Sequence, residues 1–199
     1  MSSIYVYGAS GHGLVVADIA KACGYKNIIF IDDGDNLYPC FNEITKTVDI
    51  PLIFGVGDNI IREKLFKRVE ESNLNIMTLI HPSAIISPSV EVGIGTVIMP
   101  NVVVNSNTNI GKGVILNSSA VIEHENHIDD FVHISPNVSL AGNVTINTNS
   151  HIGIGSTVIQ SIIIGKRSII GAGSVVVNNV ENNTLAYGNP CRSIRRLDE

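Results

Sequence analysis

The strongest constraint in this sequence is a six-residue period that runs through its second half. Steps of six from Ile86 to Val176 land on Ile, Val or Leu at all sixteen positions, without an insertion. Such a period is typical of a parallel β-helix, in which each hexad forms one flat face and its apolar side chain points inward. Three hexads close one triangular coil of about 18 residues, so the period predicts about five coils.

Two further positions of the hexad are restricted. Two residues before each apolar position, the sequence usually has a small or β-branched residue, with Asn126 as the main exception. We expect the glycines that recur one residue after the apolar position to turn the corners of the coil with a positive φ. These glycines are Gly93, Gly111, Gly153, Gly165 and Gly171.

The first 80 residues follow a different pattern, in which strand-like and helix-like segments alternate. Strands are predicted for "SIYVYG", "NIIFIDD", "PLIFGVG" and "IMTLI", and helices for "LVVADIAKACGY" and "NIIREKLFKRVEESN". Alternation of this kind predicts a small parallel βαβ sheet. We therefore expect a Rossmann-like α/β domain over residues 1–80 and a β-helix domain over residues 81–199, which ends in the basic tail "NTLAYGNPCRSIRRLDE".

Composition and charge exclude several classes of partner. The net charge of -5 argues against DNA or RNA as a ligand, because a phosphate backbone needs a basic face. No apolar run approaches the ~20 residues of a membrane-spanning helix, and the N-terminus has no signal-peptide layout. Three cysteines outside any metal-type spacing favour a cytoplasmic protein without a metal. An outer face rich in Val and Ile would need covering, so we expect the β-helices to assemble.

The segment "GASGHG" follows the first predicted strand and opens the first predicted helix. Backbone N–H groups at a helix N-terminus favour anions, and glycines let a phosphate approach closely. The spacing G-x-x-G-x-G supports a nicotinamide cofactor poorly. A tight turn without a ligand is the alternative, but such a turn has no need of a histidine. The candidate sugar-nucleotide-binding residues are Gly8, Ser10, Gly11, His12 and Gly13 in this loop, with Asp32 and Asp33 at the end of the second strand.

Three histidines and four acidic residues lie in the segment "VIEHENHIDDFVHIS", residues 121–135. Positions one coil apart are stacked on a β-helix, so we expect His124 to lie under Gly142 and His133 under His151. His124 and His133 are half a coil apart, which places them on different sides of the prism. They can meet at one small ligand only if a neighbouring chain brings them together.

A resemblance to a known family rests on the motifs "YGASGHGLVVADIAKACGY", "IDD", "LNSSAVIEHE", "HIDDFVHISP", "LAGNV" and "YGNPCRSIRR". Together they resemble the sugar-nucleotide acetyltransferases of bacterial glycan pathways, above all the UDP-4-amino-sugar N-acetyltransferases of bacillosamine biosynthesis. Perosamine N-acetyltransferases and sialic acid O-acetyltransferases are related members. The resemblance covers almost the whole chain and implies a left-handed β-helix, although right-handed crossovers are the general preference. It also implies acetyl-CoA as co-substrate, a nucleotide-linked amino sugar as acceptor, and a homotrimer with active sites between subunits.

The resemblance implies roles for single residues as well. His124 would be the general base and Glu125 would orient its imidazole, although alternation along a strand keeps Glu123 as the other candidate. Gly142 would offer its backbone N–H to the oxyanion, and His133 would contact the acetyl-CoA thioester. The remaining implied contacts are Asn117 with the sugar, and Ile154, Gly173 and Arg192 with acetyl-CoA.

These observations favour acetyl-CoA-dependent N-acetylation of a nucleotide-linked 4-amino-4,6-dideoxy sugar, with UDP favoured over GDP. No serine or cysteine stands beside His124 as an obvious nucleophile, so the amine would attack directly. O-acetylation of a sialic-acid-like sugar would use the same fold and base, and a non-catalytic scaffold is a further alternative. A zinc lyase of the γ-carbonic anhydrase type belongs to another class. Its ligands would be His124, His127, His133 and His151. Asn59 and Arg62 in "GDNIIR" match the family, but the sequence indicates no role for them.

Overall fold

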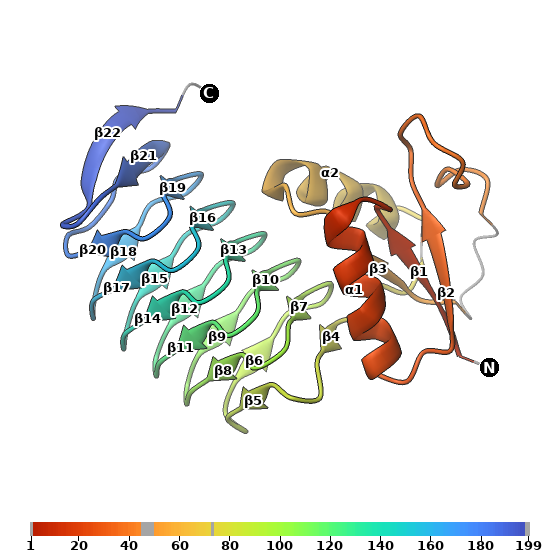
Figure 1. The fold of residues 1–199 in the computed structure, drawn as a ribbon, viewed down its shortest axis with the longest axis horizontal. Coiled ribbons are helices and arrows are strands. Elements are labelled where there is room, and N and C mark those ends of the chain that lie inside the picture. Colours follow the sequence, from red (N-terminus) through yellow and green to blue (C-terminus); the bar gives the residue numbers. More distant parts are fainter. Residues whose placement is uncertain (1, 45–49, 73, 198–199) are drawn as a thin grey trace.

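The computed structural model describes residues 2–44, 50–72 and 74–197. It has a small α/β part at the N-terminal end and a long stack of triangular coils (Figure 1). The α/β part contains β1 (Ser3–Tyr7), α1 (Gly11–Ala22), β2 (Asn27–Ile31), β3 (Leu52–Phe54) and α2 (Asn59–Glu70). Its strands form a parallel sheet in the order β2-β1-β3, which confirms the predicted βαβ arrangement. No helix among the described residues is long and apolar enough to cross a membrane.

The coils confirm the predicted parallel β-helix, because strands of successive coils pair in parallel, one coil apart. Three flat faces result, named face 1, face 2 and face 3. Face 1 contains β4 (Leu79–Ile80), β7 (Val97–Ile98), β10 (Ile115–Leu116), β13 (His133–Ile134), β16 (His151–Ile152), β19 (Ile169–Ile170), β21 (Thr184–Tyr187) and β22 (Arg192–Arg196). Face 2 contains β5 (Ile85–Ile86), β8 (Val103–Val104), β11 (Val121–Ile122), β14 (Ser139–Leu140), β17 (Thr157–Val158) and β20 (Val175–Val176). Face 3 contains β6 (Glu91–Val92), β9 (Asn109–Ile110), β12 (His127–Ile128), β15 (Thr145–Ile146) and β18 (Ile163–Ile164).

The residues of the six-residue period form the core of the β-helix. From Ile98 to Val176, every sixth side chain is at most 4% exposed. Ile86 and Val92 are only half-buried, because they lie in the first coil, at the end of the stack. Full burial of such a side chain contributes about 1.5–3 kcal/mol, so this apolar column supplies much of the driving force for folding.

The recurring glycines have a different cause from the one expected. Positive φ occurs two residues after them, so the expectation of a positive φ at these glycines is wrong. They are needed for close approach instead, since a Cβ on Gly93 would lie 2.5 Å from the carbonyl carbon of Gly111. Asparagine tolerates the left-handed conformation and occupies many of the corners. These corner asparagines are Asn101, Asn107, Asn137, Asn143 and Asn149, with φ between 56 and 62°.

Small polar residues before the core positions tie each coil to the next. The Ser150 hydroxyl is fully buried, donates to the carbonyl of Gly165 (2.6 Å) and accepts from the N–H of Ser168 (3.1 Å). Asn126, the exception in the pattern, also links one coil to the next. Its side-chain amide donates a hydrogen bond to the carbonyl of Ala141 (3.0 Å). Backbone groups at these corners are therefore satisfied inside the protein.

Both ends of the stack depart from the hexad. At the N-terminal end, the predicted strand "IMTLI" divides: Ile76 bridges to Leu52 of the α/β part, whereas β4 already pairs with β7 of the β-helix. At the C-terminal end, the basic tail forms the antiparallel hairpin β21–β22, which continues face 1 (Figure 1). Residues 76–80 therefore connect the two parts directly, because Ile76 pairs with the α/β part and β4 with the first strand of the next coil on face 1.

We expect Ser150→Ala to destabilise the protein by about 1–3 kcal/mol, because the N–H of Ser168 and the carbonyl of Gly165 would lose a buried partner. Urea unfolding measures this change as a shift of the midpoint at constant slope. Ser193→Ala is the matched control, since Ser193 is exposed in β22. The control should change the free energy of unfolding by less than about 0.5 kcal/mol, and equal effects of the two variants would contradict the role of the buried hydroxyl.

Candidate functional site

His124 and Glu125 occupy the turn between β11 and β12, at the corner of faces 2 and 3. Nδ1 of His124 lies 3.0 Å from Oε2 of Glu125, and both side chains are exposed. The Glu123 carboxylate instead accepts a hydrogen bond of 3.0 Å from the amide of Asn105. Of the two acids that the sequence left open, Glu125 therefore contacts the imidazole. A carboxylate on Nδ1 keeps the ring proton there and leaves Nε2 as the basic nitrogen.

Gly142 lies directly against this imidazole, as the one-coil spacing predicts. A Cβ on Gly142 would lie 2.5 Å from Cε1 and 2.7 Å from Nε2 of His124, so any other residue would displace the ring. The backbone N–H of Gly142 has no hydrogen-bond partner within the described part of the chain. The basic nitrogen of His124 thus lies close to Gly142, a residue whose backbone donor is unused.

Asn117 and His133 lie on face 1, where the α/β part packs against the β-helix. His133 is 8% exposed, and its Nε2 lies 3.2 Å from Nδ2 of Asn117. Its Nδ1 lies 3.3 Å from the carbonyl oxygen of Gly57, in the loop after β3. The ring stacks on that of His151 with centroids 4.6 Å apart, and the His12 ring lies 6.1 Å away. The predicted stacking of His133 under His151 is confirmed, and the glycine-rich loop reaches the same cluster.

These imidazoles are neutral at physiological pH. Burial lowers the pKa of His133 to about 3, and the nearby His151, Arg62 and His12 lower it further. Burial, reinforced by Arg62, also lowers the pKa of His12 to about 4. With Gly57 on one nitrogen of His133 and Asn117 on the other, no N–H of the ring is free for a thioester. The thioester contact of His133 therefore stays a prediction.

The glycines at the start of α1 and in the loop before it fall into two groups. Gly8 has a φ of 111°, and a Cβ on Gly13 would overlap the carbonyl oxygen of Gly8, so both are required by the turn. Gly11 has no positive φ, and a Cβ there would meet nothing within 4 Å. The side chain of Ser10, the N-cap of α1, makes no capping hydrogen bond. Ser10 and Gly11 therefore leave the positive N-terminus of α1 open to an anion.

Asp32 and Asp33 both have partners within the α/β part. Asp32 accepts a hydrogen bond of 2.7 Å from the N–H of Ala9 and so fixes the glycine loop. Asp33 binds the Tyr7 hydroxyl and the Arg68 guanidinium. Burial alone would raise the pKa of each carboxyl, but these hydrogen bonds outweigh burial and hold both pKa values below the usual range. Recognition of a base by either carboxylate stays a prediction.

The strand order directs the α/β part toward face 1. Ligands of parallel α/β sheets bind at the carboxyl ends of the strands, where the strand order reverses. In the order β2-β1-β3 this point lies between β1 and β3. The loop after β1 leads into α1, whose first turn carries His12. The loop after β3 carries Gly57, whose carbonyl contacts His133. The ligand-binding edge of the sheet therefore meets the histidine cluster of the β-helix.

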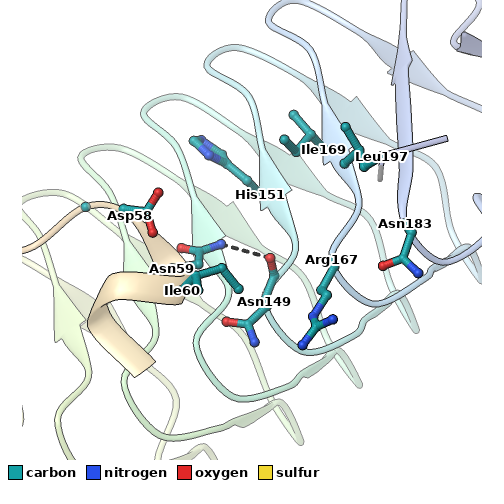
Figure 2. Close-up of a pocket in the computed structure, with 10 residues that line it drawn as sticks. Asp58, Asn59, Ile60, Asn149, His151, Arg167, Ile169, Asn183 and Leu197 are labelled. Carbon is teal, nitrogen blue, oxygen red and sulfur yellow. Dashed lines mark hydrogen bonds between the residues drawn. The ribbon is translucent and has the colours of Figure 1, made fainter. Parts of the chain in front are cut away.

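A pocket of about 420 Å³ lies beside this cluster, between the start of α2 and face 1 (Figure 2). Asp58, the N-cap of α2, and Ile60 in its first turn line one side of the pocket. His151, Arg167 and Ile169 line it from the coils. Because the His151 ring stacks on His133, the pocket adjoins the cluster directly. It offers a cation, a carboxylate and apolar walls in one place.

Arg62 and Asn59, for which the sequence indicated no role, join the two parts of the protein. The Arg62 guanidinium is 1% exposed and donates to the carbonyl oxygens of Gly113 (2.7 Å) and Phe131 (2.9 Å) at coil corners. It also donates to the carbonyl of Gly57 (3.1 Å). Helical spacing could have indicated that Asn59 and Arg62 are buried, because they lie on the same face of α2 as the apolar residues Phe66 and Val69. The buried residues of α2 are Asn59, Arg62, Phe66 and Val69.

The remaining predicted site residues occupy other corners of the same chain. Ile154 is exposed at the corner of faces 1 and 2, and its carbonyl accepts a hydrogen bond of 2.8 Å from the N–H of Gly173. Arg192 begins β22 at the C-terminal end. The His124 corner, the α/β part and the Ile154 corner thus surround one prism on three sides. A single small ligand could reach all three only across an interface between chains.

The four histidines considered as zinc ligands do not converge within one chain. His127 lies on face 3, where its Nε2 is 2.9 Å from the carboxylate of Asp129. His124 lies at the neighbouring corner, whereas His133 and His151 lie on face 1. In the described ranges, no three His, Cys, Asp or Glu side chains are grouped so that they could hold a metal ion.

Solved structures of similar fold include two proteins that are at least 30% identical to this chain. PerB from Caulobacter crescentus, in complex with CoA and GDP-perosamine, is 30% identical with a TM-score of 0.93, and the match covers 98% of both chains. The acetyltransferase domain of PglB from Neisseria gonorrhoeae, in complex with acetyl coenzyme A, is 34% identical with a TM-score of 0.90. That match covers 96% of this chain and 98% of the PglB domain.

Sequence comparisons agree with these structures. Residues 3–69 match the family described as the PglD N-terminal domain. The UDP-N-acetylbacillosamine N-acetyltransferase of Bacillus subtilis is 35% identical over 108 residues, which are 48% of this chain and 50% of that protein, so the match spans half of that relative. The fold and site define a hexapeptide-repeat acyltransferase with an N-terminal α/β domain. The chain belongs to the PglD-like family of sugar-nucleotide N-acetyltransferases, which confirms the resemblance found in the sequence.

The histidine cluster predicts a loss of stability in mild acid. An unfolded imidazole takes up a proton near pH 6.5, whereas folded His133 stays neutral down to about pH 3. Between these values the unfolded chain binds more protons, so stability falls as the pH is lowered from 7 to 4. His133→Gln should reduce the difference in unfolding free energy between pH 7 and pH 4 by about 2 kcal/mol or more, measured by urea unfolding at both pH values.

His127→Gln is the matched control for this prediction, because His127 is 56% exposed and lies on the outside of face 3. The control should keep the pH dependence of the wild type. A His133→Gln variant with unchanged pH dependence would show that the buried imidazole does not govern acid stability.

Proposed function

We propose that this protein transfers the acetyl group of acetyl-CoA to the 4-amino group of a nucleotide-linked 4-amino-4,6-dideoxy sugar, with UDP favoured over GDP. The observation that carries the proposal is the His124–Glu125 pair, whose free Nε2 lies close to Gly142, a residue with an unused N–H. PerB, solved with CoA and GDP-perosamine, and the Bacillus subtilis relative, named for a UDP-linked sugar, support the substrate class. The choice of UDP rests on the sequence motifs.

His124 acts as the general base in this proposal. As the sugar amine attacks the thioester carbonyl and the C–N bond forms, Nε2 of His124 takes the proton that the amine must lose. Glu125 stabilises the imidazolium through Nδ1, and the oxyanion accepts a hydrogen bond from the N–H of Gly142. Collapse of the intermediate breaks the C–S bond, and the departing sulfur takes the proton from His124. The products are the acetamido sugar and CoA.

The sugar nucleotide binds the α/β part in this proposal. Its diphosphate lies at the open N-terminus of α1, beside Ser10 and Gly11, where the helix dipole and free N–H groups favour negative charge. The sugar then extends toward Asn117 on face 1. The adjoining pocket supports this path, because it offers space and the cation of Arg167 next to the histidine cluster.

A homotrimer completes the site in this proposal. The His124 corner of one chain meets the α/β part of a neighbour, and acetyl-CoA lies between them along Ile154 and Gly173, with its phosphates near Arg192. The outer surface of face 2 supports association, because it carries an exposed Ile85 (68%) and the half-buried Val103 and Val121, which a neighbour would cover. The distribution of the site residues over three corners supports it as well.

We expect His124→Ala to lower kcat/KM for the amino sugar by about 100- to 10,000-fold, the usual contribution of a general base. Release of free thiol from acetyl-CoA, with UDP- and GDP-linked 4-amino sugars tested side by side, measures this loss and identifies the nucleotide. His127→Ala is the control and should stay within about twofold of wild type, because His127 lies on face 3. Full activity of His124→Ala would exclude it as the base. If the wild type releases no thiol with either sugar, the proposed N-acetylation is wrong. An O-acetylation assay and a measurement of bound zinc would then test the two alternatives.

The shared site predicts complementation between two inactive variants. Gly11→Trp fills open space at α1 and should block the sugar nucleotide, whereas His124→Ala removes the base. Trimers assembled from equal amounts of both variants should regain about a quarter of wild-type activity, because a quarter of interfaces combine an intact base with an intact loop. A site built within one chain would give no recovery, since every chain carries one defect.

A further inference from the structure

The Arg62 guanidinium takes no part in the proposed reaction, yet it is buried among backbone carbonyls. Nε donates to Gly113, and Nη2 donates to Phe131 and to Oδ1 of Asn59 (2.8 Å). Nη1 donates to the carbonyls of Val56 and Gly57, both at 3.1 Å. Burial lowers the pKa of Arg62 to about 9, so the side chain stays charged at neutral pH. A buried cation is a costly way to join two surfaces that apolar residues could join as well.

The Gly57 carbonyl links Arg62 to the histidine cluster. This oxygen accepts from Nη1 of Arg62 at 3.1 Å and from Nδ1 of His133 at 3.3 Å. Arg62 also holds the neighbouring carbonyl of Val56, so the loop after β3 is fixed against the coil corners. The position of the acceptor for His133 is therefore set by the guanidinium.

One tautomer of His133 satisfies both of its contacts. Oδ1 of Asn117 accepts from the N–H of Ser118 (2.8 Å), so Nδ2 of Asn117 is the atom that faces His133. An amide nitrogen donates, so Nε2 of His133 accepts and the ring proton resides on Nδ1, where it meets the Gly57 carbonyl. The other tautomer would place two donors together at Nε2 and two acceptors together at Nδ1.

The same contacts fix the amide of Asn117. Its oxygen is held by Ser118, and one of its two N–H groups is held by His133. The second N–H is left to point away from the imidazole. Stacking of His151 on the His133 ring and the bond between Ser135 Oγ and Nε2 of His151 (2.8 Å) support the arrangement from the next coil.

We infer that Arg62 is a positioning residue: it holds the Gly57 carbonyl on His133, selects the Nδ1-protonated tautomer, and so directs the Asn117 amide toward the acceptor sugar. The inference rests on the proposed function, in which Asn117 contacts the sugar. Arg62 then affects the sugar half of the reaction and not the acetyl-CoA half. A purely structural Arg62 would alter stability and leave the tautomer of His133 as it is.

Nitrogen NMR of histidine-labelled protein without substrate tests the tautomer directly. The wild type should show His133 with a protonated Nδ1 and an unprotonated Nε2, assigned by the signals that His133→Gln lacks. A protonated Nε2 in the wild type would overturn the inference. Because no substrate is present, this result stands even if no amino sugar is acetylated, which would instead contradict the proposed function.

Steady-state kinetics of Arg62→Lys test the consequence for the sugar. The single lysine ammonium cannot reach all the carbonyls that the guanidinium holds. We therefore expect a mixture of His133 tautomers and a fall in kcat/KM for the amino sugar of about 10- to 100-fold. KM for acetyl-CoA should stay within about twofold of wild type. Lys67→Met, an exposed change on the same helix, is the control and should alter neither the spectrum nor the kinetics.

A folded Arg62→Lys variant with the wild-type tautomer and wild-type kinetics would overturn the inference. If Arg62→Lys does not fold, Asn59→Ala replaces it, because it removes one acceptor of the guanidinium and keeps the cation. Asn59→Ala should move the spectrum and kcat/KM for the sugar in the same direction by a smaller factor. Unchanged values in that variant would likewise count against the positioning role.

Discussion

The one-coil register of the β-helix decides which side chains of this protein meet. Each coil is locked to the next by parallel strand pairing and by buried polar groups such as the Ser150 hydroxyl. Because the repeat has no insertion and residues 18 apart are stacked, Gly142 lies against His124 and His151 stacks on His133. The His124–Glu125 pair and the buried histidines are thus positioned by the same repeat that forms the core.

The junction between the two parts follows a different physical logic. The coils are held together mainly by burial of apolar side chains, which depends little on the exact orientation of the groups in contact. Arg62 is held by hydrogen bonds to carbonyls of fixed position, and these require a defined orientation. Several donors on a rigid plane define an orientation more sharply than an apolar contact of the same area. The β-helix therefore supplies stability, and the junction supplies the angle at which the glycine-rich loop faces the coils.

Spacing alone predicted the β-helix, the parallel α/β sheet and the stacking of His124 under Gly142, because each follows from periodicity. It could not choose between Glu123 and Glu125. Glu125 has a φ of 60°, and strand alternation does not apply to a corner residue in that conformation. The sequence did not reveal the role of Arg62, since its acceptors in the coils are backbone carbonyls some 50 to 70 residues away and no side-chain pattern marks them.

The hairpin β21–β22 affects whether molecules of this protein can associate end to end in concentrated solution. A stack of parallel strands with a bare last coil would offer an open edge, onto which another molecule could add and start a fibre. Here the final strand turns back antiparallel, and all of its residues are exposed. Its arginines repel an identical edge, and the change in strand direction leaves no template for a further coil. The basic hairpin thus ends the repeat at one molecule.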